Sequence, residues 1–236
     1  VLLSRIPWPL EKGDKLRAFN QIKSLSRNHE IFLCALNDDA SVDKNEAKQR
    51  LLPYCKEIEF IDLPKIKILW NLALAFLKGM PIQCGYFYNK NAHSCIHNFI
   101  QRVQPDMLYG QLVRVAPYLQ KEKCKKTIDY QDVLSYGMKR RMDTASFYKR
   151  PIFNMEYKRL QQFERQIFDE FDVKTIISDS DRQLIDHPRR NEIVIVPNGL
   201  AVSMGSPMMV LASSMERIDS REVLVMSPSL LVLFSA

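Results

Sequence analysis

The sequence predicts an α/β fold, a Rossmann-like parallel sheet with helices on both faces. Three observations predict it. Short apolar runs alternate with segments of helical periodicity at nearly every step up to residue 199. Prolines, glycines and short polar residues separate these segments. The composition, 46% hydrophobic and 26% charged, is that of an ordinary globular protein.

The first half of the chain begins with the end of a buried strand at 1–4. Two prolines and a glycine within residues 7–13 then force a loop, and Asp14 is positioned to cap a helix over 14–27. The further elements expected in this half are strands at 31–36 and 57–63 and helices at 42–52, 66–78 and 91–103.

The second half continues the alternation. A proline precedes a short strand at 106–109, and a long helix at 152–171 carries an apolar face with helical spacing. Because strands and helices alternate, the strands should be parallel and joined by right-handed crossovers. Ligands of such sheets bind beyond the carboxyl ends of the strands. The further expected elements are strands at 126–130, 173–178 and 192–196 and helices at 113–120, 132–142 and 179–185.

Composition changes near the end of the chain. Residues 1–200 are expected to form one domain and residues 201–236 an atypical tail. The tail holds five of the ten methionines and eight serines, and the strand–helix alternation stops there. It resembles the out-of-frame translation of a truncated gene. A disordered or weakly packed tail is the alternative.

Net charge and cysteine content indicate which kinds of partner, cross-link and metal site to expect. The net charge of +7 favours anionic partners such as nucleotide phosphates, although solubility alone also explains it. The sequence has no dense block of lysine and arginine, so we expect no nucleic-acid partner. Five widely spaced cysteines without a C-x-x-C pair argue against a disulfide framework and a zinc site, and for the cytoplasm. His93 and His97 have metal-ligand spacing, but no third ligand is evident, so no metal is expected.

The loop after the first strand is a candidate phosphate-binding segment. A glycine lets the backbone approach a ligand, and free N–H groups at a helix start favour an anion. A capped helix with solvated charges is the alternative. The chain has no G-x-G, so this is neither a dinucleotide fingerprint nor a P-loop. The candidate residues are Lys12, Gly13, Asp14, Lys15 and Arg17.

Two later loops supply further candidates. Asp129 lies at the carboxyl end of the strand at 126–130, and Asp132 starts the next helix. Carboxylates there can accept hydrogen bonds from sugar hydroxyls or act as catalytic bases. A plain helix N-cap is the alternative for Asp132. Gln111 and Arg114 should border the ligand crevice after the preceding strand. A simple ion pair with a nearby carboxylate is the alternative for Arg114.

Four stretches together resemble a known enzyme family. They are "SRIPWPLEKGDKLRAFNQIKSLS", "DYQDVLSYGMKRR", "EYKRLQQFERQIFDEFDVKTIISDSDRQLI" and "EIVIVPNGL". Their order and spacing resemble the group 1, or family four, retaining glycosyltransferases of the bacterial surface-polysaccharide type. The resemblance covers about residues 1–200. It implies the N-terminal, acceptor-side half of the two-domain GT-B fold, with the second domain not recognisable in the remaining residues.

The resemblance also implies a function. A member transfers a sugar from a nucleotide-sugar donor to a glycan or lipid-linked acceptor, with retained configuration and no required metal or cofactor. By analogy Gly13 and its neighbours lie near the donor diphosphate, and Gln111, Arg114, Asp129 and Asp132 border the acceptor. Many relatives carry a histidine in the loop matching 110–114, where this chain has Gln111.

The analogy further predicts that this chain alone is inactive, because the second domain supplies positive groups that stabilise the leaving nucleotide. The apolar helix at 66–77 and the basic charge would suit peripheral contact with the inner membrane surface; a helix buried on the sheet is the alternative. The main alternative function is a non-catalytic binding module that keeps only the first domain. A nucleotide-dependent oxidoreductase is disfavoured by the missing G-x-G-x-x-G.

Overall fold

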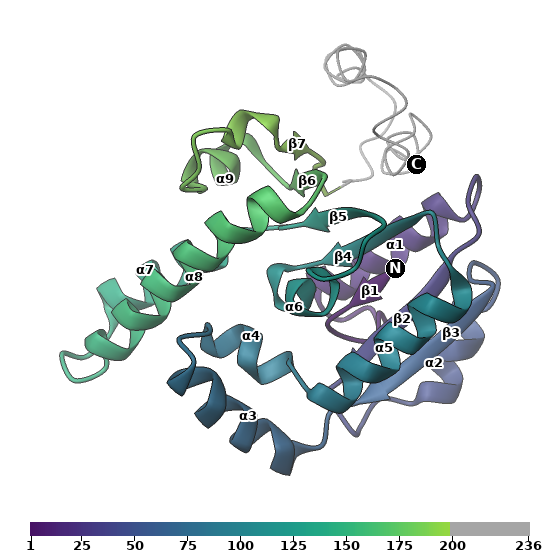
Figure 1. The fold of residues 1–236 in the computed structure, drawn as a ribbon, viewed down its shortest axis with the longest axis horizontal. Coiled ribbons are helices and arrows are strands. Elements are labelled where there is room, and N and C mark those ends of the chain that lie inside the picture. The colour runs from purple at the N-terminus through teal and green to yellow at the C-terminus, as the bar shows by residue number, and fades with distance from the viewer. Residues whose placement is uncertain (199–236) are drawn as a thin grey trace.

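A computed structural model of the protein describes residues 1–198, apart from the side chains of residues 65–69 and 71. The expected tail at 201–236 therefore lies outside the described residues. The described chain forms one all-parallel sheet of seven strands with helices on both faces, which confirms the predicted α/β class (Figure 1).

The strand order is β3-β2-β1-β4-β5-β6-β7. The chain places β2 and β3 on one side of β1 and then crosses back to add β4 to its other side, so the order reverses between β1 and β4. The strands are β1 (Leu2–Leu3), β2 (Phe32–Asn37), β3 (Glu57–Asp62), β4 (Met107–Gln111), β5 (Lys125–Asp129), β6 (Val173–Ile176) and β7 (Val194–Ile195).

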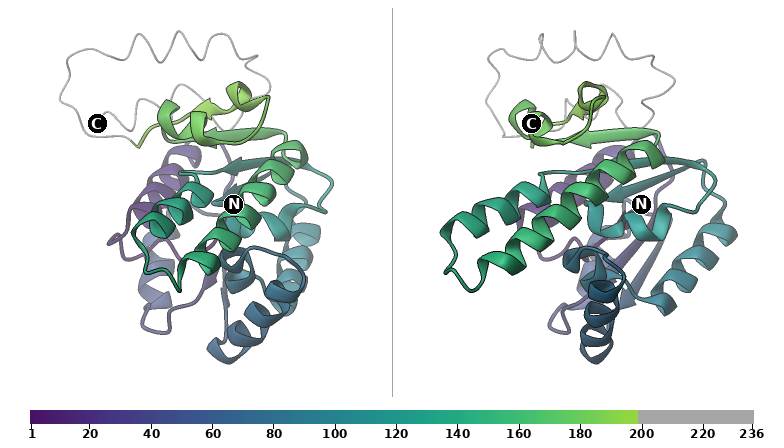
Figure 2. Two further views of the ribbon diagram at one scale, coloured as in Figure 1. Left: turned by 90° about the vertical axis from the view of Figure 1, so that its left-hand side faces the viewer. Right: turned by 60° about the vertical axis from the view of Figure 1, so that its left-hand side comes forward.

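Helices cover both faces of this sheet. In the left view of Figure 2, α1 and α2 lie on one side of the sheet and α3 and α5 on the other. The helices are α1 (Gly13–Leu25), α2 (Lys44–Leu51), α3 (Lys65–Leu77), α4 (Ile82–Phe87), α5 (Lys90–Val103), α6 (Ala116–Leu119), α7 (Leu134–Thr144), α8 (Arg150–Glu170) and α9 (Asp179–Leu184), with 3-10 turns η1 (Val113–Val115) and η2 (Arg190–Glu192). No helix within residues 1–198 is long and apolar enough to cross a membrane.

Strand side chains alternate between two apolar cores. Leu33 and Ala35 of β2 pack with α1 and α2, whereas Cys34 and Leu36 pack with the helices of the opposite face. Such strands carry apolar residues on both sides, as expected for a parallel sheet covered on both faces. The sheet is therefore the buried platform, and polar side chains gather where its strands end.

Three differences from the sequence expectations concern the surroundings of the site. Helix α4 was not expected, and the buried carboxylate of Glu156 accepts its first N–H groups, from Ile82 at 2.8 Å and Gln83 at 3.0 Å. Strand β4 runs two residues further than expected, so it includes Gln111. The apolar helix α3 is present, but most of its described side chains are exposed, so the buried-helix alternative does not hold for them.

Candidate functional site

Four charged side chains gather at the carboxyl edge of the sheet, where the strand order reverses. Open α/β sheets bind ligands at such a switch point. Arg5 follows β1, Asp14 lies in the first turn of α1, Arg114 follows β4 in η1, and Asp132 follows β5. The other three side chains all lie close enough to Arg114 to influence its ionisation. These four residues are called the switch-point cluster below.

The two cations of the cluster share one aromatic ring. The guanidinium carbons of Arg5 and Arg114 lie 5.4 Å and 5.3 Å from the ring centroid of Phe87 in α4. Arginine stacks readily on aromatic faces, and this fixes the plane of the guanidinium group. Arg5 is also paired with carboxylates, lying 3.7 Å from Asp14 and 3.4 Å from Asp38. Its charge is therefore compensated within the protein.

Arg114 has no such compensation. No carboxylate in the described part of the chain lies within ion-pair distance of it, so the ion-pair alternative does not hold there. Its Nη2 donates to Gln83 at 3.2 Å, and its buried Nε has no hydrogen-bond partner. Burial lowers the pKa of Arg114, and the charge of Arg5 lowers it further. A half-buried cation with unused donors is a candidate anion-binding group.

Asp132 is the exposed carboxylate of the cluster. Helix α7 begins at Leu134 with Val133 in the N-cap position, so Asp132 is not the cap that was the alternative for it. Although Asp132 is exposed, loss of hydration to the surrounding protein raises its pKa, and Arg114 opposes that rise. A carboxylate with a raised pKa beside a ligand site can exchange a proton with a ligand hydroxyl.

Asp129 has a different environment. It ends β5, is fully buried, and accepts six hydrogen bonds that are shared equally between its two oxygens. Burial alone would raise the pKa of Asp129, but Arg17 and the other donors hold it below its ordinary value. The donors are Arg17 Nε and Nη2, Gln21 Nε2, Tyr109 Oη, Thr175 Oγ1 and the backbone N–H of Gln131.

The buried network around Asp129 connects distant segments. Arg17 lies in α1 and donates through Nε at 2.8 Å to Asp129, and its Nη1 donates at 2.8 Å to the side chain of Asn198. Gln111 Nε2 lies 3.4 Å from both Gln21 Oε1 and the carbonyl oxygen of Asp14. Gln111 and Arg17 therefore belong to the network beneath α1, and Arg114 and Asp132 belong to the switch-point cluster.

The remaining residues of the first loop lie at the start of α1. Lys12 is the N-cap residue and makes no side-chain cap, so Asp14 lies in the first turn and is not the cap. Lys15 is buried, with its Nζ 3.3 Å from the carbonyl oxygen of Trp8. A Cβ on Gly13 would meet nothing within 4 Å, so packing does not require glycine there. The open space leaves the backbone of this helix start accessible to a ligand.

Packing does require a glycine in β4. A Cβ on Gly110 would lie 2.9 Å from Leu119 Cδ1 and 3.1 Å from Val115 Cγ2. Leu119 and Val115 are fully buried. Gly110 therefore lets α6 and η1 lie close against β4, and this fixes the start of the segment that carries Arg114.

Sequence reasoning missed two backbone features of the site. Leu112 (φ 68°) directly follows β4, and Gln131 (φ 61°) lies two residues after the end of β5. Both adopt the left-handed backbone region that residues other than glycine rarely occupy. The Nε2 of the buried Gln131 has no hydrogen-bond partner. Strained residues of this kind concentrate at functional sites. No composition signal in the sequence marks them, because neither residue is a glycine or asparagine.

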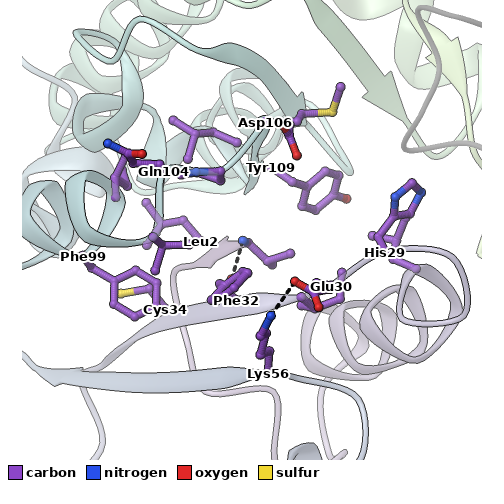
Figure 3. Close-up of a pocket in the computed structure, with 18 of the residues that line it drawn as sticks. Leu2, His29, Glu30, Phe32, Cys34, Lys56, Phe99, Gln104, Asp106 and Tyr109 are labelled. Carbon is purple, nitrogen blue, oxygen red and sulfur yellow. Dashed lines mark hydrogen bonds and ion pairs between the residues drawn. The ribbon is translucent and has the colours of Figure 1, made fainter.

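A cavity lies at the opposite end of the strands. It measures about 930 Å³ and opens beside Leu2, Phe32, Cys34 and Phe99 (Figure 3). Ligand sites of open parallel sheets lie at the carboxyl ends, so we do not assign the function to this cavity.

The histidines with metal-ligand spacing have other neighbours. His97 Nδ1 lies 2.8 Å from Glu122 Oε1, and the ring of His93 stacks on Tyr118. The described residues contain no group of three or more metal-ligating side chains. The five cysteines are free thiols.

Comparison of the sequence with profiles of protein families and with curated proteins finds no match.

Proposed function

We propose that this chain is the first, acceptor-side domain of a retaining glycosyltransferase that uses a nucleotide-sugar donor. The four sequence stretches that resemble this family motivate the proposal. The strand order and the charged residues at the switch point are compatible with it. The acceptor is a glycan or a lipid-linked glycan of cell-surface polysaccharide assembly.

The guanidinium of Arg114, which has no carboxylate within ion-pair distance in the described residues, is the observation that carries the proposal. A half-buried cation without a carboxylate partner is costly unless an anion is bound to it in the working state. The planar fork of a guanidinium matches the oxygen atoms of a phosphate group. The start of α1, which is open at Gly13, adds the positive partial charge of a helix N-terminus. A diphosphate between Arg114 and the start of α1 would use both features.

The two aspartates take different roles in this account. Asp132 is exposed and borders Arg114, so it is the carboxylate available to a hydroxyl of the acceptor. All lone pairs of Asp129 are engaged by protein donors, so Asp129 acts as a positioning residue that holds α1 through Arg17. The leaving nucleotide still needs further positive groups from a second domain. We therefore expect no sugar transfer by the 236-residue chain alone.

Titration with nucleoside diphosphates tests the proposal. We expect uridine or guanosine diphosphate to bind weakly and saturably by calorimetry, and Arg114→Met to weaken binding about tenfold or more, the loss typical of a charged hydrogen bond. Arg27→Met removes an exposed arginine that follows α1 and is the matched control. Absence of binding by every nucleoside diphosphate, or equal binding by the Arg114 variant, would overturn the proposal. Sugar transfer by the isolated chain would contradict the expected need for a second domain.

A further inference from the structure

Exposed apolar side chains concentrate on two segments outside the switch-point cluster. The described residues expose ten large apolar side chains, and seven of them lie on α3 or on the tip of the α7–α8 hairpin, defined here as residues 142–153. Scattered exposed apolar residues are ordinary, but a concentration of them indicates an interaction surface. The seven are Trp70, Leu74, Phe76, Leu77, Phe147, Tyr148 and Ile152.

The two segments belong to one side of the molecule. The α7–α8 hairpin and α3 both project at the lower left in Figure 1. The guanidinium carbon of Arg159 in α8 lies 4.9 Å from the ring centroid of Phe76. Glu156 of the same helix caps α4, which directly follows α3. Helix α8, which begins within the hairpin tip, therefore contacts both α3 and α4.

The wider stretches that contain α3 and the hairpin tip, residues 64–80 and 134–153, are rich in basic residues. Residues 64–80 contain three lysines and no acidic residue, and residues 134–153 contain five basic residues and one acidic residue. The combined net charge of these two stretches equals the +7 of the whole chain, so the other residues together have no net charge. Lys149 and Arg150 directly follow the exposed aromatic pair Phe147 and Tyr148.

We propose that α3 and the hairpin tip form a docking surface for an anionic lipid membrane. Aromatic side chains prefer the interface between lipid headgroups and acyl chains, and neighbouring lysines and arginines pair with anionic headgroups. Phe147 is 83% exposed and Leu77 is 80% exposed, so both can enter the membrane without refolding of the protein. This arrangement of aromatic tips and basic flanks complements a lipid surface, and it does not depend on the proposed function.

Vesicle flotation of the full chain tests the docking surface. We expect the protein to float with vesicles that contain phosphatidylglycerol, to stay behind with pure phosphatidylcholine, and to be released by salt. Replacing Phe147 and Tyr148 together by serine should abolish flotation. Replacing Lys149 and Arg150 together by glutamine should lower the partition coefficient roughly 30-fold, because each basic residue near an anionic surface strengthens binding about fivefold.

Matched controls and a spectroscopic readout accompany this test. Leu52→Ser removes an exposed apolar side chain directly after α2, and Lys23→Gln with Arg27→Gln removes two exposed charges at the end of α1 and just beyond it. Neither should alter flotation. Trp70 is 73% exposed, so its fluorescence should shift to the blue on vesicles, and Trp70→Phe should abolish the shift.

Three outcomes would overturn the inference. In the first, the protein does not float with vesicles that contain phosphatidylglycerol. In the second, the hairpin-tip variants float as well as the parent protein. In the third, the protein forms concentration-dependent dimers, and the phenylalanine–tyrosine variant does not. The last outcome would make the surface an interface between two copies of the chain. Because all the substituted side chains are exposed, an unchanged thermal unfolding midpoint shows that each variant is folded.

Discussion

Arg17 of α1 and Asp129 of β5 lie 112 residues apart in the sequence and form a buried ion pair, with Nε 2.8 Å from Oδ2 and Nη2 3.3 Å from Oδ1. Burial opposes both charges, yet the pair raises the pKa of Arg17 and lowers that of Asp129 relative to their ordinary values. The pair fixes the first helix against the end of the central strands. Arg17 also donates to the side chain of Asn198, which ties the segment after β7 to α1.

Removing the charge of Asp129 should strongly destabilise the fold. Asp129→Asn leaves the guanidinium of Arg17 buried without a counter-charge, and we expect the free energy of unfolding to fall by about 3–5 kcal/mol. Thr175→Val removes one of the six hydrogen bonds and should cost only about 1 kcal/mol. Urea unfolding measures both. Similar losses for the two variants would show that the charge pair is not the dominant interaction.

In contrast to Asp129, Arg114 should matter for ligand binding and not for the stability of the fold. Because its half-buried charge has no ion-pair partner in the described residues, Arg114→Met should leave the thermal midpoint unchanged or raise it. The same variant should lose diphosphate binding. A clear loss of stability would show that Arg114 is a structural residue, and the anion site would then lose its main support.

Glu164 predicts the pH dependence of stability. It is buried beneath α7 and accepts hydrogen bonds from the N–H and hydroxyl of Ser135, and burial raises its pKa from 4.5 to about 7. The folded state therefore binds a proton that the unfolded state has released between these two values. Stability should fall as the pH rises through this window.

Glu164→Gln removes that titration and keeps an oxygen for the N–H of Ser135. The slope of unfolding free energy against pH should flatten between about 4.5 and about 7. Glu11→Gln, at an exposed loop residue, should keep the slope of the parent protein. A parent protein whose stability rises over the same pH range would contradict the assignment.

The two site glycines should respond differently to alanine. Gly110→Ala places a methyl group 2.9 Å from Leu119 Cδ1 in a fully packed core, and we expect a loss of about 1–3 kcal/mol. Gly13→Ala meets no atom within 4 Å, so unfolding stability should stay equal or rise by about 0.5–1 kcal/mol. Reduced diphosphate binding by the Gly13 variant, without a loss of stability, would support a ligand close to its backbone.

The sequence was sufficient for the architecture and for part of the site. Apolar runs and helical periodicity are local properties of the sequence, so the position of each strand could be predicted to within a few residues. Helix α4 was missed because it has six residues and owes its cap to Glu156, more than 70 residues away. The buried partner of Asp129 could not be foreseen, because ion pairs across a sheet have no local sequence signature.

Exposure was the least predictable property. Helix α3 is apolar enough to be buried, yet its described residues mostly face solvent, since periodicity does not reveal whether a neighbouring element covers a helix. The residue types of Leu112 and Gln131 likewise give no indication of their left-handed backbone conformations.

The account is tested most directly by amide chemical-shift mapping with uridine and guanosine diphosphate. It predicts that the shifts cluster at the start of α1, at Gly13 and Lys15, and around Arg114, and that they disappear in Arg114→Met. Shifts around Cys34 and Phe99 would instead assign the ligand to the cavity at the amino ends of the strands. That result, or the absence of any saturable shift, would contradict a diphosphate site at the switch point.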